Sequence, residues 1–355
     1  MRAVHVVVPD GIDDPVRPSG GNNYDRHVCR ELGTLGWSVH QHAVPGAWPR
    51  PTAEALAALA GVVERIPGGD LLLLDGLIAS TAPEVLTPNA GRLRLVVLVH
   101  MPLGHRPPDE AAEETRRREG AVLRAASAVV TTSRWSRGRL LELYRLPTER
   151  VHVAEPGVDP ADLAGGTMTG GTLLCVAAVI SEKGHDVLVE ALLSMSELSW
   201  ECVCVGRADR DPAFVEDLGR RVLDGGISDR VCFTGPLTGS ELDRSYAAAD
   251  LMVLPSRAET YGMVVTEALA RGLPVLAADV GGLTEAMGYG ADGSRPGLMV
   301  AADDPAALAA ALRAWLGDPE LRRRSRLAAR ERRDSLSRWS TTASAMAGVL
   351  AEALR

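Results

Sequence analysis

Short, almost uninterrupted apolar segments alternate with amphipathic helical segments along the chain, and this alternation restricts the fold more than any other feature. Consecutive apolar positions predict strands that are buried on both faces, and helical crossovers between such strands predict a parallel sheet. In the first part of the chain the predicted strands are Val4–Val8, Leu71–Leu74, Leu95–Val99 and Ala128–Thr132, with helices at Tyr24–Leu35, Ala53–Arg65 and Arg117–Ala126.

The alternation pauses once, at Asp159–Gly171, where a segment with four glycines predicts a linker. It resumes with predicted strands at Leu173–Val176, Trp200–Val205, Arg230–Phe233, Leu251–Leu254 and Pro274–Ala277. Because 355 residues exceed what one hydrophobic core usually serves, we predict an α/β protein of two doubly wound, Rossmann-like parallel-sheet domains facing a cleft. The predicted domains are residues 1–160 and 171–335, followed by a C-terminal helix at 336–355 that either packs back on the first domain or pads one domain only.

The composition argues against several classes of function. A net charge of −8 argues against nucleic-acid binding, and an aromatic content of 4% argues against a stacking platform for single-stranded nucleic acid or glycans. No apolar run approaches the roughly 18 residues of a membrane-spanning helix. Arginines outnumber acidic residues between positions 91 and 150. This excess belongs either to ordinary solvated helices or to a surface that associates weakly with an anionic membrane.

The cysteines and the start of the chain bear on compartment and metal content. The five cysteines form no C-x-x-C pair, so neither a disulfide framework nor a zinc site is expected. Val4–Val8 is too short for the apolar region of a signal peptide, and Pro9 ends it. We therefore expect a cytoplasmic protein without a metal site, and the oligomeric state stays open.

The segment Pro255–Gly272 carries the most informative chemical pattern. Gly262 is predicted to open a helix that ends at Gly272, with Glu259 just before this helix and Glu267 inside it. The free N–H groups and positive dipole at a helix start favour phosphate binding. Two carboxylates beside such a start suit sugar hydroxyls on either side of a diphosphate.

Two other segments have features of phosphate sites. Lys183 is the one lysine among 38 basic residues, and it is predicted at a helix start after the strand Leu173–Val176. Gly20, Gly21 and Asn22 precede the predicted helix Tyr24–Leu35, where paired glycines let the backbone approach a ligand. Neither segment has the spacing of a Walker A loop or of a dinucleotide-binding loop.

Together these motifs resemble those of the retaining glycosyltransferases of family 4, which have the GT-B fold. Glu259 and Glu267 match the family's E-x7-E pair, and Lys183-Gly184 matches its K-G motif. Gly20-Gly21 matches its amino-terminal glycine loop, and weaker matches follow in the family's order at Gly157–Asp159, Phe233–Gly235 and Gly281-Gly282 with Glu285. The resemblance implies transfer of a sugar from a nucleoside-diphosphate sugar to an unidentified acceptor.

The resemblance also implies residue roles. His100 would lie near the reacting carbon, Glu259 would hold hydroxyls of the donor sugar, and Lys183 would hold the diphosphate; these three are the expected catalytic residues. The expected donor-binding residues are Gly20, Gly21, Asn22, Lys183, Gly206, Arg207, Thr234, Gly235, Leu237, Glu259, Thr260, Tyr261, Gly262, Met263, Val264 and Glu267, with Glu267 on the ribose. Members of the family need no metal or other cofactor, since lysine and helix dipoles neutralise the leaving diphosphate. Retention is thought to proceed by front-face attack through an oxocarbenium-like state.

One position departs from the family pattern. The family usually has an arginine five residues before the lysine, where this chain has Ala178, and Arg207 or Arg134 would have to replace it. Two alternatives to transfer therefore stay open: a catalytically weak homologue that binds a nucleotide sugar, and a nucleotide-sugar epimerase of the same fold. Asp209-Arg210-Asp211 looks like a metal-binding D-x-D motif, but it occurs once in a polar segment that we interpret as a solvated loop.

Overall fold

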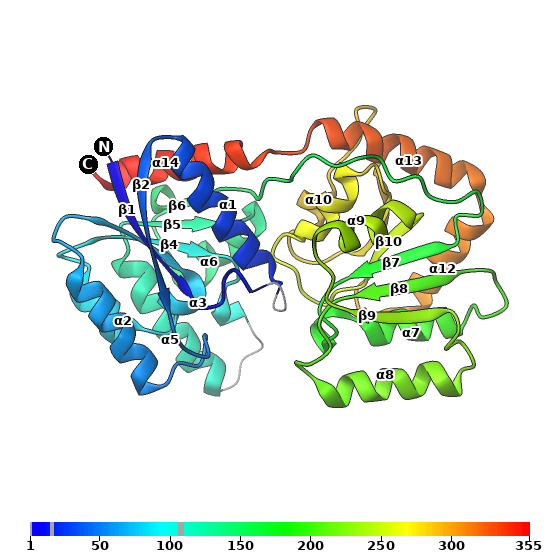
Figure 1. Cartoon of the computed structure of the whole chain (residues 1–355), viewed down its shortest axis with the longest axis horizontal. Helices are drawn as coiled ribbons and strands as arrows, with labels where there is room; N and C mark the ends of the chain where they lie inside the picture. The colour runs from blue at the N-terminus through cyan, green and yellow to red at the C-terminus, as the bar shows by residue number, and fades with distance from the viewer. Residues whose placement is uncertain (1, 15–17, 106–109) are drawn as a thin grey trace. The chain divides into compact units, whose positions relative to one another are not determined.

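The computed structural model describes residues 2–14, 18–105 and 110–355. Within these residues, the strands form two six-stranded sheets, and all strand pairs are parallel (Figure 1). The chain divides into two compact units, one formed by the first strand, Ser19–Gly157 and Ser337–Arg355, the other by Val158–Leu336. The two-domain, parallel α/β architecture predicted from the alternation is confirmed.

The first unit has the strand order β2-β1-β3-β4-β5-β6. Its strands are β1 (Arg2–Pro9), β2 (Trp37–Val44), β3 (Leu71–Asp75), β4 (Arg94–Val99), β5 (Ala128–Thr131) and β6 (Val151–Val153). Its helices are α1 (Gly20–Thr34), α2 (Ala53–Arg65), α3 (Gly76–Ala79), α4 (Pro83–Leu86), α5 (Glu110–Ala125), α6 (Arg134–Tyr144) and α14 (Trp339–Ala353), with 3-10 turns η1 (Thr87–Asn89), η2 (Leu103–His105) and η3 (Thr148–Arg150).

The second unit has the strand order β12-β11-β10-β7-β8-β9. Its strands are β7 (Thr172–Val176), β8 (Glu201–Val205), β9 (Val231–Gly235), β10 (Leu251–Leu254), β11 (Val275–Ala278) and β12 (Gly297–Val300). The turn η4 (Ser181–Lys183) precedes the helices α7 (His185–Leu193), α8 (Pro212–Asp224), α9 (Gly239–Ala248), α10 (Met263–Ala270), α11 (Leu283–Met287), α12 (Pro305–Gly317) and α13 (Pro319–Asp334).

Side-chain alternation along the strands builds a core on each face of each sheet. In β3, Leu72 and Leu74 pack with α2, α5 and α6, so Leu71, Leu73 and Asp75 point to the opposite face. That second face is covered by α1 and by α14, which pack against each other (Figure 1). Since both faces of β3 are covered, its four leucines are all buried, which is why the strand reads as a continuous apolar run.

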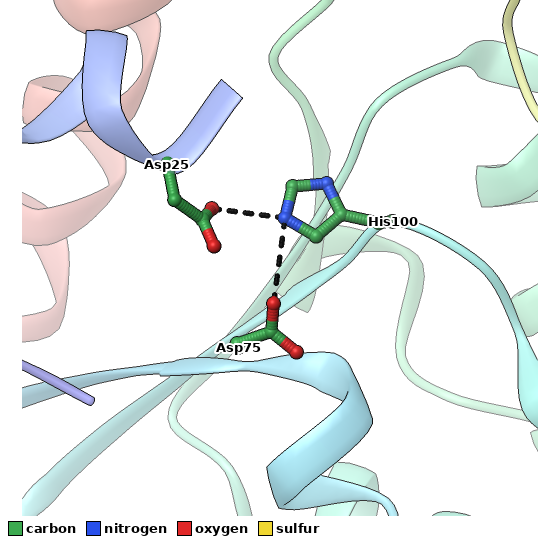
Figure 2. A group of neighbouring side chains, drawn as sticks. All are labelled: Asp25, Asp75 and His100. Carbon is green, nitrogen blue, oxygen red and sulfur yellow. Dashed lines mark hydrogen bonds and ion pairs between the residues drawn. The ribbon is translucent and has the colours of Figure 1, made fainter. Parts of the chain in front are cut away.

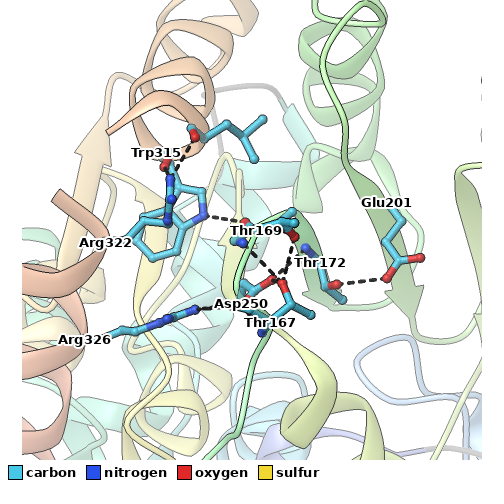
Figure 3. Close-up of polar contacts among 11 residues, drawn as sticks. Thr167, Thr169, Thr172, Glu201, Asp250, Trp315, Arg322 and Arg326 are labelled. Atoms are coloured by element: carbon cyan, nitrogen blue, oxygen red, sulfur yellow. Dashed lines mark hydrogen bonds and ion pairs between the residues drawn. The ribbon is translucent and has the colours of Figure 1, made fainter. Parts of the chain in front are cut away.

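The predicted linker is part of the second unit. A buried carboxylate at the start of β10, Asp250, accepts from the N–H of Thr167 (2.5 Å), the hydroxyl of Thr167 (2.5 Å) and the N–H of Thr172 (3.0 Å) (Figure 3). Arg326 of α13 donates to the same carboxylate at 2.8 Å. The boundary therefore lies between Gly157 and Val158, and the predicted linker Asp159–Gly171 was misassigned, because its glycines and threonines fold around one charged group.

The C-terminal region is shared between the units. α13 belongs to the second unit and α14 to the first. Trp339 of α14 stacks on His27 of α1 at a ring separation of 4.2 Å, and Thr342 donates to the carbonyl of Glu155 at 2.7 Å. Among the described residues, no helix is both long and apolar enough to cross a membrane.

Several predicted boundaries shift, and some elements were missed. α1 begins at Gly20 instead of Tyr24, because Ser19 caps it by accepting from the N–H of Asn22 at 3.1 Å. The edge strands β2, β6 and β12 were not predicted. Six of the eight residues of β2 are exposed or partly exposed, as expected where an edge strand is covered incompletely. Apolar runs alone do not identify such strands.

Candidate active-site residues

Lys183 and Glu259 meet beyond the carboxyl ends of β7 and β10, which are neighbours in the second sheet. The ammonium of Lys183 donates to Oε1 of Glu259 at 2.5 Å, and the Ser256 hydroxyl donates to the same oxygen at 3.0 Å. The two charged side chains are 26% and 12% exposed. A cation and a carboxylate, 76 residues apart in the sequence, thus form one partly accessible polar group.

The two loops that carry this pair lie in direct contact. Gly184 has φ +70°, and a Cβ there would lie 2.0 Å from the carbonyl oxygen of Pro255, so only glycine fits. Arg257 donates its N–H to the carbonyl of Glu182 at 2.9 Å and binds both carboxylate oxygens of Asp186 at 2.8 and 2.7 Å. Burial alone would raise the pKa of Asp186, but the hydrogen bonds and charge of Arg257 lower it. The Lys183 loop is therefore held in place by a paired arginine. Lys183 ends the 3-10 turn η4, and α7 begins two residues later, so the predicted helix start is displaced to His185.

The start of α10 lies close to Glu259 in the sequence. Gly262 is the N-cap residue and Met263 the first helical residue, so the N–H groups of Met263 and Val264 lack partners within the helix. The backbone around Glu259 is fixed, since its carbonyl accepts the N–H of Gly282 at 3.0 Å. The positive partial charge at the start of α10 therefore lies three residues after Glu259 in the chain.

Glu267 lies within α10 and is held by a neighbouring helix. The hydroxyl of Tyr246 in α9 donates to Oε2 of Glu267 at 2.9 Å, and the guanidinium of Arg271 stacks 4.5 Å from the Tyr246 ring. Burial raises the pKa of Glu267, against the lowering effect of the Tyr246 bond and the Arg271 charge. One carboxylate oxygen is thus engaged in a fixed orientation.

Five further predicted donor residues lie at or just after the carboxyl ends of β8 and β9. Gly206 comes directly after β8, and its N–H donates to the carbonyl of Gly235, the last residue of β9, at 3.0 Å. Thr234 is exposed. Arg207 forms a two-bond pair with Asp209, at 2.9 and 2.7 Å. Leu237 lines a cavity of about 380 Å³ formed mostly by β7 and α9.

The structure supplies ordinary partners for the D-x-D segment. Asp209 pairs with Arg207, and Asp211 caps α8 by accepting the N–H of Phe214 at 3.2 Å. In the described part of the chain, the one convergence of three potential metal ligands is Asp25, Asp75 and His100, whose ligand atoms lie within 4.8 Å of one another.

In the first unit, His100 lies against two carboxylates (Figure 2). Its Nε2 is 2.9 Å from Oδ1 of Asp25 and 3.8 Å from Oδ2 of Asp75. The shorter distance is that of a direct hydrogen bond. Burial lowers the pKa of His100, but the charge and hydrogen bond of Asp25 and the charge of Asp75 raise it to about 8.

The register of the sheet explains this convergence. β3 and β4 pair with Asp75 opposite Leu98. His100 comes two residues after Leu98, so it points to the same face of the sheet as Asp75. α1 covers that face and supplies Asp25. Neither carboxylate was predicted, although Asp75 directly after four leucines is a usable signal: a charged residue at the carboxyl end of a buried strand.

The predicted glycine loop is the start of a helix. Gly20, Gly21 and Asn22 form the first turn of α1, and the N–H of Asn22 is already bonded to Ser19. A Cβ at Gly21 would lie 3.3 Å from the His100 ring. Gly21 therefore packs against His100 within the first unit.

Comparison with known proteins gives the family. The Glycosyltransferase Family 4 model matches residues 4–162, and the Glycosyl transferases group 1 model matches residues 170–318. Each half of the chain therefore matches a glycosyltransferase family. The two models fall on the two structural units, each with its own parallel sheet.

Curated relatives of this glycosyltransferase match only in part. The D-inositol 3-phosphate glycosyltransferase of Jonesia denitrificans is 34% identical over 251 residues, which cover 65% of this chain and 58% of the relative. The protein of the same name from Xylanimonas cellulosilytica is 34% identical over 67% of this chain and 60% of its own length. The matches thus span less than two thirds of these relatives.

Solved structures confirm the GT-B fold over the whole chain. A sucrose-phosphate synthase from Thermosynechococcus elongatus has a TM-score of 0.78 at 21% identity, covering 99% of both chains. Anabaena HepE in complex with UDP and glucose has a TM-score of 0.77 at 17% identity, covering 99% of this chain and 100% of its own. At these identities the likeness concerns the fold.

Proposed function

We propose that this chain is a retaining glycosyltransferase that moves a sugar from a nucleoside-diphosphate sugar to an acceptor. The observation that carries the proposal is the Lys183–Glu259 pair beside the start of α10. This group offers a compact cation and free helix N–H groups for the diphosphate, together with a carboxylate for sugar hydroxyls. The assignment of retention rests on the resemblance to the E-x7-E family.

In this proposal the donor changes the partners of Lys183. The diphosphate takes the ammonium, and Glu259 turns its freed oxygen to hydroxyls of the sugar. Glu267 accepts from the ribose through the oxygen that Tyr246 does not use. As the bond to the diphosphate breaks, Lys183 and the N–H groups of Met263 and Val264 stabilise the growing negative charge. His100 of the first unit acts in the same reaction near the reacting carbon.

The acceptor class comes from the curated relatives alone. Their printed names make D-inositol 3-phosphate the first acceptor to assay. The decisive experiment measures release of nucleoside diphosphate from UDP-, GDP- and ADP-sugars, with and without this acceptor. A thermal-shift screen of the same donors reports binding separately, since a ligand of the native state raises the Tm.

A catalytically weak homologue is the second candidate. It is favoured by Ala178, which leaves Lys183 without the family's usual arginine, and by Arg207, which is already paired with Asp209. For this candidate, a donor would raise the Tm while no acceptor promoted nucleotide release. An epimerase would instead convert the donor sugar without any acceptor.

We expect activity to survive saturating EDTA. Lys183 and the α10 start provide the positive charge that Mg²⁺ provides in other transferases. The assay compares nucleotide release before and after chelation. Complete loss of release, restored by Mn²⁺ or Mg²⁺, would contradict metal independence.

Substitutions of Glu259 and Glu267 are expected to change the affinities for nucleoside diphosphate and for nucleotide sugar differently. Glu267→Gln should weaken nucleoside diphosphate and nucleotide sugar equally, by about 1.5–3 kcal/mol, because both ligands carry the ribose. Glu259→Gln should leave nucleoside diphosphate affinity nearly unchanged and lower the transfer rate, because its contact is with the sugar. Calorimetric titration of both variants with both ligands measures this difference. Equal losses of both affinities in Glu259→Gln would refute the division.

A further inference from the structure

His100 is contacted at one ring nitrogen by two carboxylates. Asp25 from α1 and Asp75 from the end of β3 both approach Nε2, and the other ring nitrogen, Nδ1, points away from them (Figure 2). A single N–H serves as donor for this side of the ring. The 2.9 Å distance to Asp25 is that of a hydrogen bond, and a proton on Nε2 would be its donor.

The two carboxyl groups are themselves buried together. Asp25 is 3% and Asp75 4% exposed. Oδ2 of Asp25 is buried without a hydrogen-bond partner, and the carboxyl groups of Asp25 and Asp75 bring an oxygen each within 4.8 Å of one another. A contact between two carboxylates is repulsive unless one carries a proton. A proton on Asp75 would give this buried oxygen a donor.

Space and neighbouring charges favour this assignment. Asp25 and Asp75 line a cavity of about 10 Å³ whose other walls are apolar apart from Cys29, and this is at the lower limit for one water molecule. The titratable groups facing the cluster are Tyr24 and Cys29 of α1, whose pKa values burial raises. Both are therefore neutral near pH 7. With a charged His100, two ionised carboxylates would leave one uncompensated buried charge, whereas one shared proton leaves none.

The remaining contacts fix the plane of the ring. Tyr24 packs edge-on against His100 at a ring separation of 5.2 Å, and its hydroxyl is anchored on the carbonyl of Ala154 at 2.8 Å. Gly21, on the same helix as Tyr24, also lies against the ring, where a Cβ would be 3.3 Å from Cδ2. Asp75 is held in turn by the N–H of Leu77 at 2.6 Å. The ring thus has little freedom to rotate or flip.

We propose that Asp25 and Asp75 are positioning residues that share one proton between their carboxyl groups and lock His100 with its Nε2–H directed at Asp25, so that Nδ1 is the nitrogen presented to substrate. The presentation to substrate rests on the proposed function; the lock does not. When the ring is charged, Nδ1–H donates to an oxygen of the ligand, either a hydroxyl or a phosphate. When the ring is neutral, Nδ1 is an acceptor. The role of this nitrogen therefore changes with the charge of the ring.

The lock is tested without any ligand, by ¹⁵N NMR of the histidine side chains in the full chain, with His100 assigned from its loss in His100→Gln. The expected result is a titration midpoint near 8 and, above it, a neutral ring protonated at Nε2. In Asp25→Asn the midpoint should fall by about one pH unit or more, because a charge in direct contact is removed. Asp75→Asn should have a smaller effect, since its oxygen is farther from the ring.

Asp70→Asn is the matched control, because Asp70 pairs with another histidine of the same unit, His5, at 3.4 Å. It should leave the His100 midpoint unchanged. A neutral ring protonated at Nδ1, or an unchanged midpoint in Asp25→Asn, would overturn the proposal. So would a change of the His100 signals on adding EDTA, which would indicate a metal among the three side chains. The wild-type tautomer decides the question even if a variant fails to fold.

A kinetic readout separates this proposal from the function. Asp25→Asn should lower kcat and shift the lower limb of its pH profile, while nucleoside diphosphate affinity stays as in the wild type. If no donor and acceptor pair supports transfer, the proposed function fails while the NMR result stands. If transfer is observed but Asp25→Asn keeps the wild-type kcat and pH profile, the presentation of Nδ1 to substrate is wrong.

Discussion

Replacing Lys183 by alanine is expected to lower the rate of sugar transfer by about two to three orders of magnitude, or about 3 kcal/mol of transition-state stabilisation. With Ala178 in place of an arginine and Arg207 already paired, Lys183 is the main candidate cation for the leaving diphosphate. The measurement is kcat/KM from nucleotide release at a saturating acceptor concentration. Lys183→Arg should restore only part of the rate, because a planar guanidinium cannot replace a compact ammonium in this loop.

Because Lys183 pairs with Glu259, the Lys183→Ala experiment needs two controls. Lys183→Ala also leaves Glu259 without its cation, so the double variant Lys183→Ala/Glu259→Gln separates this loss from the loss of the phosphate contact. Arg220→Ala removes an exposed arginine of α8 in the same unit, and it should leave kcat/KM unchanged. Wild-type turnover by Lys183→Ala would show that this lysine does not hold the diphosphate.

Asp250→Ala is expected to give the largest loss of stability, about 3–5 kcal/mol in the free energy of unfolding of the second unit. The substitution removes a fully buried carboxylate that accepts from Thr167, Thr172 and Arg326. The backbone N–H groups and the guanidinium are then left without their acceptor, and each unsatisfied buried donor is costly. Urea denaturation followed by circular dichroism measures the loss.

Asp217→Ala provides the comparison, since Asp217 pairs with the exposed Arg220 on α8. Exposed ion pairs contribute little to stability, so its midpoint should stay close to that of the wild type. If Asp250→Ala and Asp217→Ala unfolded at the same urea concentration, the segment from Val158 to Thr172 would not depend on the buried carboxylate. Asp250→Asn should be intermediate, because an amide keeps one acceptor but loses the charge.

The local sequence determined the buried strands and which candidate site residues follow them. Apolar runs such as Leu71–Leu74 and Leu251–Leu254 predicted buried parallel strands, because a strand covered on both faces must be apolar at every position. The same runs placed Lys183 and Glu259 after strands, and parallel strands end at one edge of a sheet. The fold class therefore followed from the order of residues, whereas the roles of the candidate donor residues came from the resemblance to a family.

Only the tertiary structure decided which side chains meet. The strand order puts β7 beside β10 and so brings Lys183 onto Glu259, and the register of β3 and β4 puts Asp75 and His100 on the face that α1 covers. Asp250 turns a glycine-rich segment from a predicted linker into part of the second unit. These contacts join residues far apart in the chain. Their free energy depends on strand order, register and burial, none of which a local pattern of residues specifies.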